Sequence, residues 1–141
     1  MTDEYFMDKA LIEARKAFEK KEVPIGAVIV KDNKIIAASY NTKELSKIAT
    51  HHAEINVINI ACKKLKTWHL EDCVLYTTVE PCLMCTGAII QSRIKKVVYG
   101  TDNEAFGYLR NIKDKIEIIS GIKETECRII LSDFFKEKRN K

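Results

Sequence analysis

The sequence lacks a long hydrophobic run, because no stretch of about 18 consecutive apolar residues, the minimum for a membrane helix, occurs in it. Asp3 and Glu4 stand near its start, and no basic segment leads into an apolar one as in an export signal. It also lacks internal repeats and low-complexity linkers. We therefore expect neither export nor membrane insertion, and no membrane partner.

The chain has only five cysteines, which is an odd number, and they lack the dense spacing of small secreted disulfide-rich proteins. A reducing compartment, in which thiols stay free or bind metal, fits this pattern, so we expect a cytoplasmic protein. The net charge of +4 permits polyanion binding without requiring it. With 141 residues, 46% apolar and 31% charged, we expect one globular domain over 1–141.

Apolar spacing predicts helices and strands that alternate along the chain. Four segments have helical periodicity, at about 4–22, 52–64, 83–92 and 122–138. Five short apolar runs are typical of strands, at about 25–30, 35–38, 74–78, 96–99 and 115–119. Because each apolar helix face needs a sheet face to cover it, this order predicts an α/β fold, a three-layer α/β/α domain with a mixed five-stranded sheet.

Two short motifs, residues 52–54 (His-Ala-Glu) and 81–85 (Pro-Cys-Leu-Met-Cys), each begin a predicted helix. Two thiolates separated by two residues can reach one metal from a single turn, and a histidine from another element supplies a third ligand. The open fourth position suits a catalytic zinc, which lowers the pKa of a bound water to about 7. We predict that His52, Cys82 and Cys85 hold Zn²⁺.

Glu54 stands two residues after His52. At a helix start, residues two apart point in different directions, so Glu54 can face the bound water and the substrate instead of the metal. The positive helix ends would also favour thiolates at Cys82 and Cys85. We predict that Glu54 is the proton carrier of the site.

Simpler interpretations exist for the same residues. A Cys-x-x-Cys pair alone could equally be a structural zinc half-site or a redox pair, and only its combination with Pro81 and His-Ala-Glu favours catalysis. His51 adjoins His52 but has no glutamate two residues on, so we expect it to be a loop residue near the pocket. The remaining cysteines lie in apolar stretches and are expected to pack as small core residues: Cys62, Cys73 and Cys127.

His-x-Glu followed by Pro-Cys-x-x-Cys resembles the signature of the cytidine and adenosine deaminases. Further segments, at 22–28, 78–89, 92–94 and 131–135, resemble the bacterial tRNA-specific branch of adenosine deaminases in the cytidine/deoxycytidylate deaminase superfamily. The resemblance covers nearly the whole chain and implies a cytidine deaminase-like fold with bound zinc.

The resemblance implies hydrolytic deamination of adenosine to inosine at the wobble position of a tRNA anticodon. The partner would be the anticodon stem-loop, whose unpaired loop base can enter a pocket more easily than a stacked duplex base. By the same resemblance, Glu54 moves protons, Asn41 hydrogen-bonds the purine, and the base pocket is lined by Ile25, Val79 and Ala53.

The family also places a basic, aromatic C-terminal helix against the anticodon, which implies RNA contacts at Phe135, Lys138 and Arg139. A homodimer is likewise implied by the resemblance. A simpler alternative is that the charged stretch 136–141 is a solvated, fraying helix end, and that Phe135 belongs to the core.

Two segments depart from the family pattern. Residues 48–51 (Ile-Ala-Thr-His) replace the usual Asp-Pro-Thr, and the loop at 103–108 is shortened. Two other functions stay open: a small-molecule deaminase acting on guanine or cytosine would share the metal site, whereas a non-catalytic RNA-binding or partner subunit would have lost its proton carrier. The presence of Glu54 argues against the second alternative.

Overall fold

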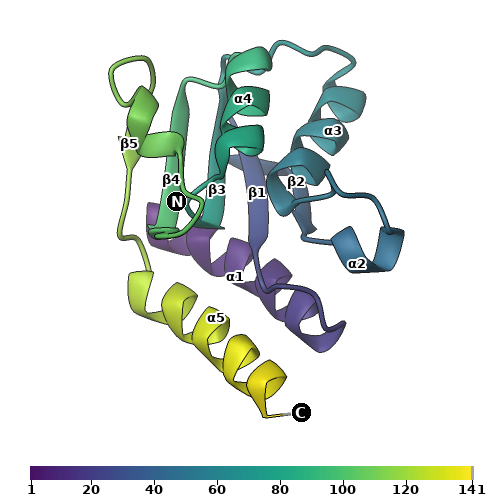
Figure 1. Cartoon of the computed structure of the whole chain (residues 1–141). Coiled ribbons are helices and arrows are strands. Elements are labelled where there is room, and N and C mark those ends of the chain that lie inside the picture. Colours follow the sequence, from purple (N-terminus) through teal and green to yellow (C-terminus); the bar gives the residue numbers. More distant parts are fainter. Residues whose placement is uncertain (141) are drawn as a thin grey trace.

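The computed structural model describes residues 1–140 and has a mixed five-stranded sheet in the order β2-β1-β3-β4-β5 (Figure 1). This confirms the predicted fold class. No helix in the described part of the chain combines the length and apolar character needed to cross a membrane. The elements are α1 (Asp3–Glu19), β1 (Gly26–Lys31), β2 (Lys34–Tyr40), α2 (Lys43–Ser46), α3 (Ala53–Leu65), β3 (Cys73–Val79), α4 (Leu83–Gln91), β4 (Lys96–Thr101), the 3₁₀ helix η1 (Leu109–Ile112), β5 (Glu117–Ile119) and α5 (Glu124–Arg139).

The sheet changes from antiparallel to parallel at β3. β1 is antiparallel to both β2 and β3, whereas β4 runs parallel to β3 and β5 runs parallel to β4. Because β3 and β4 are parallel, their carboxyl ends meet at one edge of the sheet, where Val79 pairs with Thr101. The segment that leads into α4 and the loop that follows β4 therefore start side by side, which is where ligands commonly bind in α/β folds.

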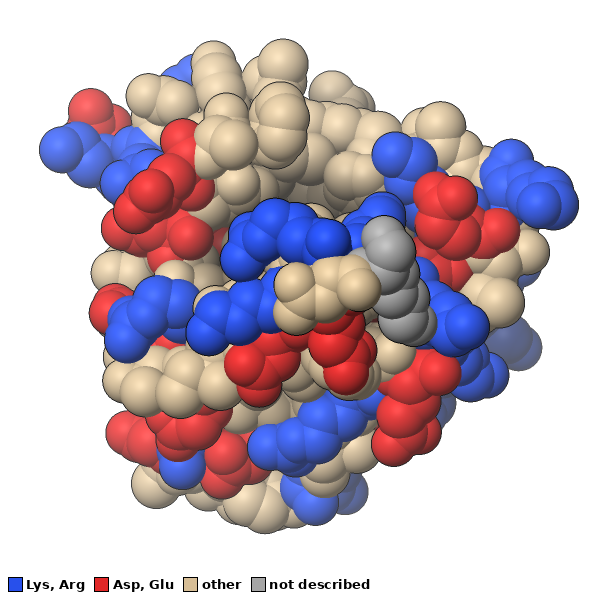
Figure 2. All heavy atoms as spheres, turned by 60° about the horizontal axis from the view of Figure 1, so that its bottom comes forward, with Lys and Arg blue, Asp and Glu red and all other residues tan. Residues whose placement is uncertain are grey.

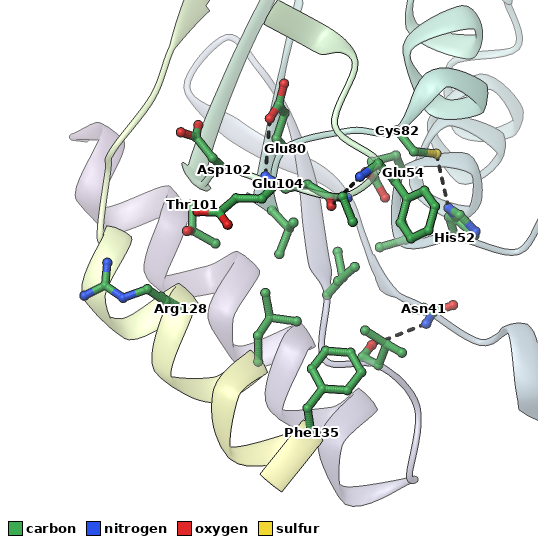
Figure 3. A pocket seen from close by; sticks show the side chains of 18 of the residues that line it. Asn41, His52, Glu54, Glu80, Cys82, Thr101, Asp102, Glu104, Arg128 and Phe135 are labelled. Carbon is green, nitrogen blue, oxygen red and sulfur yellow. Dashed lines mark hydrogen bonds between the residues drawn. The ribbon is translucent and has the colours of Figure 1, made fainter. Parts of the chain in front are cut away.

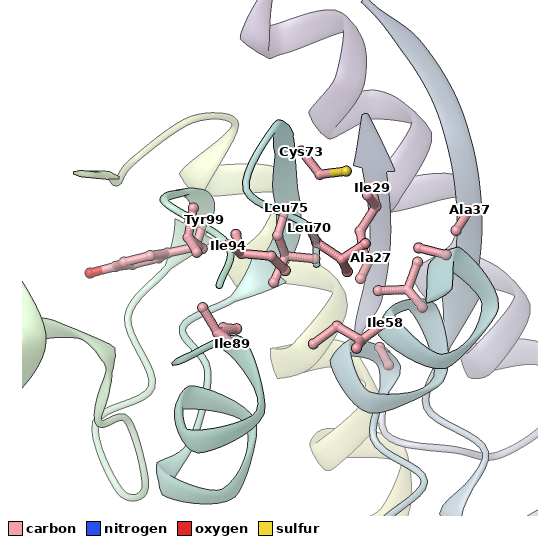
Figure 4. Packing of buried hydrophobic residues seen from close by; sticks show 14 of the residues in the cluster. Ala27, Ile29, Ala37, Ile58, Leu70, Cys73, Leu75, Ile89, Ile94 and Tyr99 are labelled. Carbon is pink, nitrogen blue, oxygen red and sulfur yellow. The ribbon is translucent and has the colours of Figure 1, made fainter. Parts of the chain in front are cut away.

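Helices cover both faces of the sheet, giving three layers (Figure 1). Apolar residues of α1, such as Leu11, pack on Val28 of β1 on one face, and α5 joins this layer. On the other face, Ile58 of α3 and Ile89 of α4 belong to a second cluster with Ile29 of β1 (Figure 4). Alternate residues of β1 thus serve opposite cores, as the two-residue period of a strand requires.

The predicted element order is correct for the longer helices and strands, with shifted ends. The first helix ends at Glu19 rather than near 22, because Lys21 has a left-handed backbone (φ 63°). The last strand is only Glu117–Ile119, and the last helix begins at Glu124. Two short helices, α2 and η1, formed in stretches for which we predicted none.

Candidate active site

The two predicted motifs meet at the N-terminal ends of two helices in the same layer. His52 is the N-cap residue of α3 and Cys82 that of α4, both with extended backbones. Neither side chain forms a capping hydrogen bond to its own helix, so both are free for another partner. Cys85 follows in the first turn of α4 and is buried.

The three predicted ligands lie together in space, with their donor atoms all within 4.8 Å of one another. Nδ1 of His52 is 3.7 Å from Sγ of Cys82 (Figure 3). The same nitrogen is 3.6 Å from Sγ of Cys85. Ligands of a tetrahedral zinc with ordinary bond lengths stand about 3.6 Å apart. The donor types and their spacing therefore suit a tetrahedral metal ion with one position open.

The protonation states of the three cluster residues also favour the binding of a cation. A hydrogen bond with Cys85 lowers the pKa of Cys82 to about 3, and His52 adds to this shift. The same hydrogen bond, together with burial, raises the pKa of Cys85 far above its usual range. A hydrogen bond with Cys82 raises the pKa of His52. The metal-free cluster thus carries a thiolate beside a protonated, buried thiol whose proton a metal ion would displace.

Glu54 lies in the first turn of α3 and is only 4% exposed. Burial raises its pKa to about 7. A carboxyl group with a pKa near neutrality can both accept and give up a proton under physiological conditions. The position next to the cluster (Figure 3) is the one that a proton carrier needs.

A pocket of about 790 Å³ opens in front of the cluster. It is lined by His52, Glu54 and Cys82, whereas Cys85 is buried outside the lining. In Figure 3, these lining residues stand on one side and Arg128 of α5 on the other. The pocket is much larger than a single base, and α5 forms one of its walls.

The predicted base-pocket residues Ile25, Asn41, Ala53 and Val79 all line this pocket. The side-chain amide of Asn41 is held by the backbone: Nδ2 donates to the carbonyl oxygen of Val23 at 3.3 Å, and Oδ1 accepts from the amide of Lys43 at 3.2 Å. The predicted residues thus lie where a bound base would contact them, and their roles stay predictions.

Of the three predicted RNA contacts, only Phe135 lines the pocket, where its side chain is 42% exposed (Figure 3). Lys138 and Arg139 lie outside the lining, in the exposed last turn of α5. The Lys138 ammonium stands 6.0 Å from the ring centre of Phe134. Figure 2 shows that basic side chains gather at this end of the molecule with acidic ones among them.

Sequence reasoning missed several residues of the site. Two buried carboxylates, Glu22 and Glu80, hold its walls through partners at least 22 residues away in sequence. Both fall in segments that carried the family resemblance, but no local spacing indicates their role. Further lining residues come from α2, from the end of β4 and the loop after it, and from α5: Lys43, Thr101, Asp102, Asn103, Glu104, Ala105, Phe106, Arg128, Leu131 and Ser132.

The sheet order and the His-Cys-Cys cluster are those of a cytidine deaminase-like fold. The chain belongs to the MafB19-like deaminase family, whose model matches residues 1–139. It is 46% identical over 148 residues to the tRNA-specific adenosine deaminase of Bacillus subtilis (strain 168), covering 99% of this chain and 92% of that protein.

Two solved structures complete the comparison. A structure from work on A-to-I editing by tRNA:A34 deaminases matches with a TM-score of 0.86 and 40% identity, over 90% of this chain and 99% of the other. The guanine deaminase from Bacillus subtilis matches with a TM-score of 0.70 and 38% identity, over 83% of this chain and 73% of the other.

Proposed function

We propose that this chain is a zinc-dependent deaminase that converts adenosine to inosine at the wobble position of a tRNA anticodon. The observation that carries the proposal is the pocket in which a buried carboxylate, Glu54, faces the His52-Cys82-Cys85 cluster. The tRNA substrate is supported by the names of relatives that are 39–46% identical over nearly the whole chain.

Zinc held by His52, Cys82 and Cys85 would supply Lewis-acid activation of a water molecule. Glu54 would take a proton from the attacking water as the water oxygen bonds to C6 of the adenine, and would pass this proton to the adjacent ring nitrogen. Glu54 then moves a second proton from the new hydroxyl group to the amino group, and the C6–N bond breaks. Adenosine and water thus become inosine and ammonia.

The pocket would hold the adenine between apolar walls. Ile25 and Val79 line it from the sheet side, and Leu131 lines it from α5. Asn41 presents an amide whose orientation the backbone fixes, so a hydrogen bond to the purine would require little reordering. An unpaired anticodon base enters such a pocket without the loss of a base pair.

Free guanine is the second candidate substrate, because a guanine deaminase shares this fold at 38% identity. The two candidates separate in one experiment. Purified, zinc-loaded protein is incubated with an anticodon stem-loop that carries adenosine at the wobble position, and in parallel with free guanine and free cytosine. A stem-loop with guanosine at that position is the control.

We expect conversion of the wobble adenosine alone, measured as inosine by mass spectrometry of the digested RNA. Conversion of guanine without conversion of the RNA would support the deaminase chemistry but identify free guanine, rather than tRNA, as the substrate. Tight RNA binding without any turnover in zinc-loaded protein would instead support a non-catalytic RNA-binding subunit.

Three further properties belong to the proposal. The chain works as one deaminase domain over 1–141, which is supported by a single sheet containing every strand of the described residues. It acts in the cytoplasm, which is supported by five free cysteines. It forms a homodimer, which is supported by apolar side chains that stay exposed on the α3 and α4 layer: Ile60, Leu83 and Ile90.

A further inference from the structure

Phe106 is the most exposed large apolar side chain among the described residues, at 76%, although it lines the pocket. It lies in the loop after β4, and Phe135 of α5 lines the same pocket. It forms no aromatic pair within residues 1–140. An aromatic ring left open at the mouth of a substrate pocket offers a flat apolar face to whatever enters.

An ion pair between a buried glutamate and a half-exposed arginine holds this loop in place. The side chain of Glu80 has no exposed surface, and its carboxylate accepts hydrogen bonds from the backbone amides of Asn103 and Arg110, both at 3.3 Å. The same carboxylate accepts a third hydrogen bond from Nε of Arg110 at 3.0 Å. The guanidinium group of Arg110 also lies 3.6 Å from the carboxylate of Asp102. The Glu80 carboxylate thus fastens residues 103 and 110, on either side of Phe106, and the Arg110 side chain holds that carboxylate in turn.

Backbone contacts join the two residues after Phe106 to the segment that contains Cys82, a predicted metal ligand. Gly107 pairs with Cys82 in an isolated antiparallel bridge, and the amide of Tyr108 donates to the carbonyl oxygen of Pro81 at 3.0 Å. A side chain at Gly107 would lie 2.3 Å from the Glu80 carboxylate, so this close approach requires glycine. Phe106 therefore directly precedes Gly107, the residue that pairs with the predicted metal ligand Cys82.

We propose that Phe106 is a substrate-binding residue whose ring stacks on a base of the RNA adjacent to the target adenine, and that Glu80 and Arg110 are the positioning pair that holds it there. The inference rests on the proposed RNA substrate. Once an adenine leaves the loop stack to enter the pocket, its neighbouring bases expose their faces at the pocket mouth. Aromatic side chains bind such faces with little dependence on sequence.

The test combines a protein variant with an altered RNA. Phe106→Ala should lower kcat/KM for the anticodon stem-loop by about 5- to 150-fold, the range expected for one base stacked on an aromatic ring. Phe106→Tyr should restore it. Stem-loops with an abasic nucleotide on one or the other side of the wobble position identify the stacked base. On the RNA lacking that base, wild type and Phe106→Ala should be equally active.

Arg110→Ala tests the positioning role. It should keep the zinc content and lower kcat/KM for the stem-loop by no more than Phe106→Ala does, because the backbone amides of residues 103 and 110 can still bond to Glu80. In the double variant it should add little to the loss, because both changes act on the same contact. Tyr5→Ala is the matched control, since Tyr5 is an exposed aromatic residue near the start of α1, the helix end away from the pocket, and kcat/KM should not change.

The outcomes separate this inference from the proposed function. Wild-type protein that fails to convert the RNA overturns the function, whereas active wild-type protein with an unaffected Phe106→Ala variant overturns only the stacking. A loss of equal size on intact and abasic RNA would assign Phe106 a structural role instead. A shift of Phe106→Ala from dimer to monomer would assign it to contact with a second copy.

Discussion

Glu54 is the predicted proton carrier, and its burial is unfavourable for a charged carboxylate. Its carboxyl group is buried and its pKa is raised to about 7, which is the cost of holding a charge away from water. A residue selected only for stability in this place would be neutral. We interpret this unfavourable burial as the condition that lets one carboxyl group both accept and donate protons.

Glu54→Gln should therefore separate activity from stability. The amide keeps the shape of the side chain but cannot carry protons, so kcat for deamination should fall by about 10²- to 10⁴-fold. The melting temperature should stay equal or rise, because a buried charge is removed. Zinc content, measured by atomic emission, should be unchanged, since Glu54 is not a predicted ligand. Wild-type turnover in this variant would reject Glu54 as the proton carrier.

The cysteines should differ sharply in reactivity. In metal-free protein Cys82 is half-buried with its pKa lowered to about 3, so it should react first with iodoacetamide at neutral pH. Burial raises the pKa of Cys73, and that of Cys127 to about 12, so both should stay unmodified. Added zinc should protect Cys82. Peptide mass spectrometry measures each site, and reaction of Cys82 at equal rates with and without zinc would contradict its assignment as a ligand.

Among the elements, α2 shows what the sequence could not predict. Long helices and strands were predictable because their apolar spacing is local, and the metal cluster because both motifs are local. The four-residue helix α2 has no buried residue and depends on Glu22, whose carboxylate accepts from the amides of Glu44 at 3.0 Å and Leu45 at 2.6 Å. No periodicity reveals a partner 22 residues away. The link from Glu80 to Arg110 was hidden for the same reason.

Glu22→Gln should loosen α2 and with it the pocket wall formed by Asn41 and Lys43. The loss of charge-assisted hydrogen bonds made by a buried carboxylate should destabilise the protein by about 1–3 kcal/mol in urea unfolding. We expect KM for the stem-loop to rise while zinc content stays constant. Glu44→Gln is the matched control, because that side chain is exposed on the same short helix. Equal effects of the two substitutions would refute the role of Glu22.

For the whole molecule, both helical layers leave large apolar side chains exposed, and those on the α3 and α4 layer lie on the helices that begin at the His52-Cys82-Cys85 cluster. Ile60 of α3 is 42% exposed, and Leu83 and Ile90 of α4 are 63% and 43% exposed. Exposed apolar side chains on neighbouring helices can form part of a contact surface. A homodimer formed there would cover them and stiffen the helices whose N-terminal ends hold the cluster.

The double variant Ile60→Lys/Ile90→Lys should weaken such a dimer. Each isoleucine contributes about 1.5–3 kcal/mol when fully buried, so the dissociation constant should rise by roughly tenfold or more. Sedimentation velocity over a range of concentrations measures the shift. Ile12→Lys on α1, at the same 42% exposure as Ile60, is the control and should leave the dimer intact. A monomeric wild type would reject the dimer, and the metal site would then have to be stable within one chain. Equal effects of the double variant and Ile12→Lys would place the dimer contact elsewhere.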